Sequence, residues 1–193
     1  MLGHIGWHDL DDASRRERKN SEEIEQRIQA LGRVELFNSL TEEEHRALAA
    51  RLRYAPFARG EAMTRQGAEA HWLYLMTAGE AEVRVSTDGN LNERVAALHA
   101  GDVFGEMGMM TGEPRSATVI ASTDVECYRL DKEAFHDILQ RRAEIAEDIS
   151  MLLAQRRVEL EAAREGLNEE AKRMRMRFHH NDLLRRIKKF FTL

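Results

Sequence analysis

The feature that most constrains the fold of this chain is a series of short apolar segments between residues 53 and 130, separated by glycine, aspartate and asparagine. Short apolar runs bounded by turn residues predict β-strands, because a helix needs a longer pattern with a period of 3.6 residues. Turns are predicted at Ala78-Gly79 and around Asp88-Gly89-Asn90, where the residue types suit a hairpin. We therefore predict an antiparallel β-roll or jelly roll within an α+β domain.

Helical patterns precede the predicted roll. Apolar residues at 24, 28 and 31 predict a helix that starts after Asn20, with Glu23 as a capping partner. Residues 8–20 are mostly charged, and we expect them to be mobile. Thr41 and Glu44 form a capping box that predicts a second helix, running to about Leu52.

Two more helices are predicted after the roll. Asp131 is a suitable N-cap for a helix that packs through Phe135, Ile138 and Leu139. Apolar residues spread between 144 and 165 predict a further helix, which Gly166 ends or bends.

Residues 101–119 carry the candidate site. Glycines at 101, 105, 108 and 112 let the backbone turn sharply and approach a ligand closely. The run after Gly105 is long enough for about one helical turn, whose free N-terminal amides suit an anion. Arg115 adds a permanently charged fork for two phosphate oxygens, whereas the carboxylate of Glu106 suits sugar hydroxyls. The stretch predicts a site for a sugar and a phosphate.

The run FGEMGMMTGEPRSA resembles the phosphate-binding cassette of cyclic nucleotide-binding domains, and the resemblance covers roughly residues 34–160. It implies a cupin-like double-stranded β-helix flanked by N-terminal and C-terminal helices. It also implies that Glu106 binds the ribose 2′-hydroxyl and that Arg115 binds the exocyclic phosphate. The rest of the phosphate cradle would come from the cassette backbone and its neighbours: Gly105, Glu106, Met107, Ser116 and Ala117.

The same resemblance places the purine of the ligand. It would lie against Ala96 and Leu98, with Val83 or Val85 opposite, although ordinary barrel core is the alternative for these residues. The last predicted helix would close as a lid. Arg156 falls where related channel domains place an arginine that contacts the base, Arg157 is its competitor, and Leu160 would cover the ring. Ser116 leaves both cAMP and cGMP open, and we expect cAMP.

Composition excludes several classes of protein. A third of the residues are charged and 42% are apolar, as in soluble globular proteins. No apolar run approaches the roughly 20 residues of a membrane span, and no signal peptide is recognisable. The single cysteine, Cys127, excludes an internal disulfide and is expected in a strand core. No residue set suggests a metal site or a catalytic centre, so we expect a cytoplasmic, non-enzymatic protein without a metal.

The C-terminal tail is basic and amphipathic. Residues 171–193 carry a net charge of +7, against −12 for the rest of the chain. Its apolar residues share one helical face: Leu183, Leu184, Ile187, Phe190 and Phe191. We predict three parts: an N-terminal arm and helix over 1–33, the binding domain with its lid over 34–165, and the tail over 166–193.

Three uses of the tail are open. It could dock onto an oligomer or partner, including packing back on its own domain, lie on a membrane surface, or contact nucleic acid. The ending LLRRIKKFF resembles the C-terminus of bacterial mechanosensitive-type channels that carry a cyclic nucleotide-binding domain. About 30 residues follow Leu160, too few for the winged helix-turn-helix of related transcription regulators, which argues against DNA binding.

The leading prediction is a cAMP-binding regulatory module in which nucleotide binding rearranges the lid and the C-terminal helices. It would regulate a partner or an ion channel, in the cytoplasm or at the cytosolic face of the membrane. One alternative is a structural or oligomerisation protein with the same fold that does not use nucleotide. The other is a relative of the transcription regulators without their DNA-binding domain.

Overall fold

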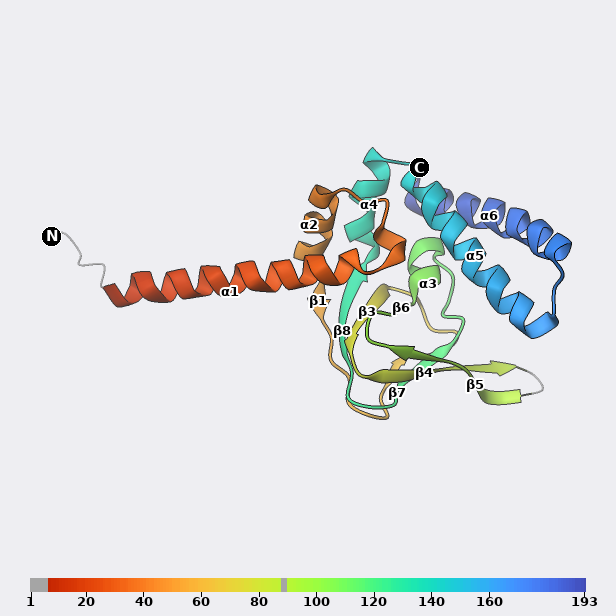
Figure 1. Ribbon diagram of the computed structural model, residues 1–193, viewed down its shortest axis with the longest axis horizontal. Helices are drawn as coiled ribbons and strands as arrows, with labels where there is room; N and C mark the ends of the chain where they lie inside the picture. Colours follow the sequence, from red (N-terminus) through yellow and green to blue (C-terminus); the bar gives the residue numbers. More distant parts are fainter. Residues whose placement is uncertain (1–6, 88–89) are drawn as a thin grey trace.

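The computed structural model describes residues 7–87 and 90–193, in which two antiparallel sheets form a roll beneath a layer of helices (Figure 1). The first sheet has the strand order β1-β8-β3-β6 and the second β2-β7-β4-β5. The strands are β1 Arg53–Tyr54, β2 Ala62–Thr64, β3 Trp72–Ala78, β4 Glu80–Thr87, β5 Asn90–His99, β6 Val103–Phe104, β7 Thr118–Ala121 and β8 Glu126–Asp131. The predicted α+β roll is confirmed.

The first predicted turn separates two strands. Gly79 joins β3 to β4 with a φ of +89°, and a Cβ there would lie 2.3 Å from the carbonyl oxygen of Asp124, so only glycine fits without strain. Strands β4 and β5 pair from Glu80 with His99 to Thr87 with Asn90, as in a hairpin. Residues 88 and 89 of the second predicted turn lie outside the described residues.

The helices confirm most of the predicted starts and ends. They are α1 Trp7–Gly32, the 3₁₀ turn η1 Glu35–Phe37, α2 Glu42–Arg51, α3 Glu106–Thr111, α4 Lys132–Arg141, α5 Ile145–Glu165 and α6 Glu169–Phe191. The capping box of α2 is formed, because the Glu44 amide donates to Thr41 Oγ1 (3.2 Å) and the Thr41 amide to a Glu44 carboxylate oxygen (2.8 Å). Asp131 caps α4, and Gly166 ends α5 in a left-handed conformation.

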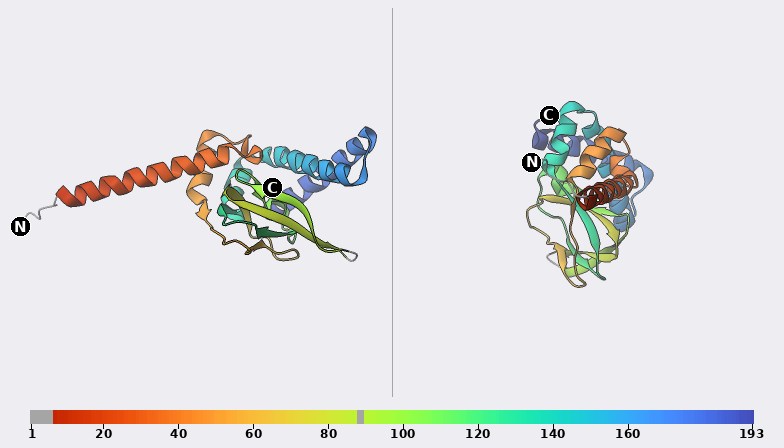
Figure 2. Two further views of the ribbon diagram at one scale, coloured as in Figure 1. Left: turned by 60° about the horizontal axis from the view of Figure 1, so that its bottom comes forward. Right: turned by 90° about the vertical axis from the view of Figure 1, so that its left-hand side faces the viewer.

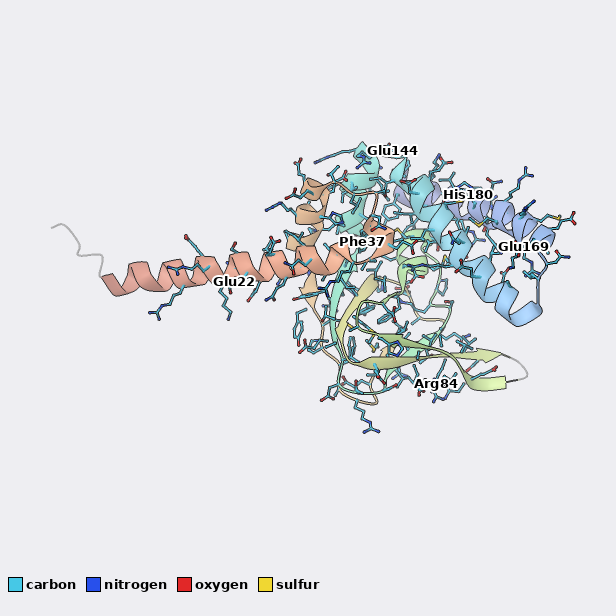
Figure 3. The ribbon with its side chains drawn as sticks, viewed as in Figure 1. Glu22, Phe37, Arg84, Glu144, Glu169 and His180 are labelled. Atoms are coloured by element: carbon cyan, nitrogen blue, oxygen red, sulfur yellow. The ribbon has the colours of Figure 1, made fainter. Side chains whose placement is uncertain are left out.

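Helix α1 differs from the prediction. It begins at Trp7, so Asn20 lies inside the helix and does not cap it, and the segment 8–20, expected to be mobile, is helical. Its sequence favours this, since Ala, Arg, Glu and Lys are good helix formers. The helix projects from the roll on the side opposite the α5–α6 hairpin (Figures 1 and 2), and Glu22 lies on the projecting part (Figure 3).

Two apolar clusters hold the domain together. The larger lies between the helices and the first sheet, where the rings of Phe37 and Phe135 lie 5.6 Å apart. The smaller fills the roll, where Tyr74 stacks on Phe104 at 4.9 Å. Cys127 is buried there as expected, and burial raises the pKa of its thiol to about 12.

The C-terminal helix α6 packs back onto its own domain. Leu183, Ile187 and Phe191 are at most 1% exposed and belong to the larger cluster, and Leu184 and Phe190 pack against it. The apolar face that would enter a membrane surface is therefore occupied within the chain. Among the described helices, none is long and apolar enough to cross a membrane.

Loss of apolar contact in α6 should destabilise the whole domain. We expect Ile187→Ala to lower the free energy of unfolding by about 2–5 kcal/mol, the usual range for such a truncation of a buried side chain. The matched control Arg185→Ala, on the exposed face of the same helix, should change it by about 0.5 kcal/mol or less. Urea unfolding followed by circular dichroism measures both, and equal effects would contradict the docking of α6.

Candidate functional site

The candidate site is organised by α3, a six-residue helix with a left-handed glycine at each end. Gly105 is its N-cap (φ +77°) and Gly112 its C-cap (φ +74°). A Cβ at Gly105 would lie 2.2 Å from Nη1 of Arg115, so this glycine both permits the turn and leaves room for the arginine. The short helix predicted after Gly105 is confirmed.

Arg115 is fixed through its side chain and its backbone. Its side chain is buried, and Nη1 donates to the carbonyl of Gly105 at 2.9 Å while Nη2 donates to the carbonyl of Trp72 at 2.5 Å. Its amide donates to the carbonyl of Ala68, and its carbonyl accepts from the amide of Gly67, both at 2.8 Å. Burial lowers the pKa of the guanidinium, which nevertheless stays charged at neutral pH.

Glu106 is the first residue of α3, and the withdrawal of its carboxylate from water raises its pKa. A hydrogen bond from its own backbone and the charges of Arg156 and Arg115 oppose this effect. The carboxylate is therefore a partly dehydrated acceptor beside a buried cation. Such an acceptor suits a neutral hydroxyl donor.

Both charged residues line one cavity of about 270 Å³ between the second sheet and α3. This volume lies near the lower limit of ligand pockets, which suits a small ligand. Nine of the predicted site residues line it: Val83, Ala96, Leu98, Gly105, Glu106, Met107, Arg115, Ser116 and Ala117. Within residues 7–87 and 90–193, no group of three or more His, Cys, Asp or Glu side chains could hold a metal ion.

The predicted apolar wall is open to the cavity. Val83 and Leu98 are half-buried and Ala96 is exposed, which differs from the fully buried positions expected for barrel core. Val85, the other candidate opposite the purine, does not line the cavity. The three wall residues face a ligand-sized space.

Neither candidate arginine of the predicted lid lines the cavity. Arg156 lines a neighbouring hollow of about 310 Å³, which shares Leu98 and Val103 with the cavity, and it pairs with Glu35 at 3.7 Å. Its competitor Arg157 pairs with Glu161 along α5 at 3.5 Å. The predicted contact of Leu160 falls on a side chain outside the described residues.

Several lining residues were not predicted as ligand contacts: Thr64, Val95, Val103, Phe104 and Val119. Gly108, which was expected to let the backbone approach a ligand, also lines the cavity. Thr64 reaches the cavity because β2 pairs with β7, where its hydroxyl donates to the carbonyl of Ala117 at 3.4 Å. A three-residue strand has too few positions for a periodic pattern. The alternation of β7 could have indicated Val119.

The fold agrees with the comparisons with known proteins. Residues 55–142 match the family model of the cyclic nucleotide-binding domain. The chain is 34% identical over 133 residues to the cAMP-dependent protein kinase regulatory subunit of Blastocladiella emersonii, a match that covers 68% of this chain and 33% of that protein. The chain spans about a third of the length of the curated relatives it matches.

Solved structures show the same architecture. The regulatory domain of protein kinase A from Toxoplasma gondii, crystallised with cAMP, is 26% identical with a TM-score of 0.57, and the match covers 64% of this chain and 51% of that one. The regulatory subunit of a cAMP-independent protein kinase A from Trypanosoma cruzi, bound to guanosine, is 27% identical with a TM-score of 0.57, covering 66% and 46%. The chain therefore carries a cyclic nucleotide-binding domain, as its cassette predicted.

The raised pKa of Glu106 gives a stability test. Above that pKa the dehydrated carboxylate destabilises the folded state, so Glu106→Gln should be more stable than the original protein at pH 7.5. The difference should shrink as the pH falls through the raised pKa and vanish below the ordinary value of 4.5. Thermal unfolding of both proteins from pH 4 to 8 measures it, and a less stable variant at pH 7.5 would refute the assignment.

Proposed function

We propose that the cavity binds cAMP and that the domain is a non-enzymatic regulatory module. The observation that carries the proposal is the placement of Arg115 and Glu106 on one small cavity with an apolar wall. A cyclic nucleotide offers a singly charged phosphate, a ribose hydroxyl and a flat purine. The guanidinium fork suits the phosphate, the carboxylate suits the 2′-hydroxyl, and the wall suits the purine.

The side chain of Arg115 is already held in place before an anion binds. Two backbone carbonyls already hold its guanidinium, so little side-chain entropy remains to be lost when phosphate oxygens approach. Ser116 and Ala117 follow Arg115 directly and line the same cavity. They are the proposed remainder of the phosphate cradle, together with Gly105, Glu106 and Met107.

The purine is proposed to lie on Val83, Ala96 and Leu98. Arg156 would then contact the base from α5, exchanging its pairing with Glu35 for the ligand, and Leu160 would cover the ring. Relatives named as cAMP-dependent regulatory subunits support adenine over guanine. The guanosine-bound neighbour is the reason to test a nucleoside without phosphate as well.

Occupancy would be transmitted through α5 and α6, the helices that follow the matched segment 55–142. A ligand shifts such an equilibrium only by its differential affinity for the two arrangements, usually about 1–3 kcal/mol. Regulatory subunits among the relatives support a protein partner. The channel-like ending of the tail supports an ion channel as another kind of partner, with the protein in the cytoplasm or at the cytosolic face of the membrane.

A structural role without nucleotide is the second candidate. It is favoured by the hydrogen bonds that satisfy the Arg115 guanidinium within the chain, and by the projecting helix α1, which could join another chain. Nucleotide binding separates the two functions, because a purely structural domain would bind neither cAMP nor cGMP.

Calorimetry with cAMP, cGMP and guanosine tests the ligand. We expect cAMP to bind most tightly, and Arg115→Ala to weaken it by about 1.5–3 kcal/mol, the range for a hydrogen bond to a charged group. Arg59→Ala, an exposed arginine away from the cavity, is the matched control and should bind as the original protein does. If neither cyclic nucleotide binds at high micromolar concentration, the proposed function is wrong. If Arg115→Ala binds cAMP with unchanged affinity, Arg115 does not bind the phosphate.

The pH dependence of binding tests Glu106. A hydrogen bond from the ribose hydroxyl to the carboxylate favours the charged form of Glu106. Binding of cAMP should therefore weaken as the pH falls toward the raised pKa of Glu106. In Glu106→Gln the affinity should be lower at pH 7.5 and nearly constant between pH 5 and 7.5. The same pH slope in both proteins would assign the titration to another group.

A further inference from the structure

The last turn of α6 lies against the C-terminal end of α3. A Cβ at Gly112 would lie 2.5 Å from a ring carbon of Phe190, so the ring covers the backbone of this C-cap glycine. One turn earlier, the guanidinium of Arg186 forms an ion pair with the carboxylate of Glu113. Two side chains of α6 thus meet two consecutive residues of the cassette.

This end of α6 is itself anchored in the domain. Nζ of Lys132 donates to the carbonyl of Phe190 at 2.8 Å and lies 3.7 Å from the centre of its ring. Nε2 of Gln140 donates to the carbonyl of Phe191 at 2.9 Å, and the Phe191 side chain is fully buried. Helix α4 therefore holds the C-terminal end of α6, including Phe190.

The contact is linked to the ligand site through a short, stiff path. Glu106 begins α3 and Gly112 ends it, so a shift of the C-cap moves the ribose acceptor with the helix. Glu113 stands two residues before Arg115, and its amide donates to Thr111 Oγ1 at 3.3 Å. Displacement at 112–113 would disturb both charged groups of the cavity.

We propose that Arg186 and Phe190 are positioning residues for the nucleotide site. They clamp the C-terminal end of α3 and so hold Glu106 and Arg115 in the geometry that binds cAMP; this rests on the proposed function. Because coupling between sites is reciprocal, bound cAMP would in turn stabilise the docked α6. The tail would then respond directly to the cassette, besides responding through the lid.

A neighbouring arginine provides the matched control. Arg185 and Arg186 both pair with Asp182 on α6, at 2.6 and 2.7 Å, but the ion pair with Glu113 belongs to Arg186. Arg185→Ala removes the same charge from the same helix. Only Arg186→Ala should release the cassette.

Calorimetric titration with cAMP tests the clamp. Arg186→Ala, Glu113→Ala and Phe190→Leu should each weaken binding about 5-fold or more, the lower end of usual coupling between sites. The double variant Arg186→Ala/Glu113→Ala should bind cAMP no more weakly than the single variant with the lower affinity, since the two substitutions remove the same ion pair. Arg186→Lys should recover part of the loss, and Arg185→Ala should bind as the original protein does. Unchanged or tighter binding in the single variants would overturn the proposal.

Amide hydrogen exchange measured without nucleotide tests the clamp independently of the proposed ligand. Amides of residues 106–117 should exchange faster in Arg186→Ala than in Arg185→Ala. If the original protein binds no cyclic nucleotide but this difference appears, the clamp stands and the proposed function fails. If cAMP binds the original protein and Arg186→Ala alike, with equal exchange, the clamp fails and the function stands.

Discussion

The buried guanidinium of Arg115 is the interaction on which the site depends. A charge removed from water is costly unless it is hydrogen-bonded, and here the carbonyls of Gly105 and Trp72 accept two hydrogen bonds from the guanidinium. Trp72 belongs to the first sheet, whereas Arg115 leads into β7 of the second. The arginine therefore ties the two sheets together at the cavity, and a side chain at Gly105 would break that tie.

Around this arginine, the helix α3 is fixed from two directions. Its N-terminal end is set by Gly105 and the guanidinium, and its C-terminal end meets Phe190 and Arg186 of α6. Helices α5 and α6 lie outside the segment 55–142 that matches the family model. In the proposed clamp, the cavity depends on a helix beyond the matched segment.

Local chemistry explains what could be predicted from the sequence. The capping box at Thr41, the N-cap at Asp131 and the cassette 101–119 each depend on residues close together in the chain, and each was identified. The start of α1 was missed because its charged first half has no apolar period. Thr64 in the cavity, the pairing of Arg156 with Glu35 and the docking of α6 on α3 depend on contacts between distant residues, which periodicity cannot show.

The separation of acidic and basic residues along the chain allows ion pairs between α6 and the rest of the domain. Acidic residues of the domain pair with the basic helix α6, Glu113 with Arg186 and Glu161 with Arg175. Partly exposed pairs of this kind are worth about 1 kcal/mol or less each, whereas burial of a leucine, isoleucine or phenylalanine is worth about 1.5–3 kcal/mol. Leu183, Ile187 and Phe191 therefore hold the helix, and the charges select its register. Of the cations that indicated a surface for an external partner, Arg186 pairs with the chain's own cassette and Arg175 with helix α5.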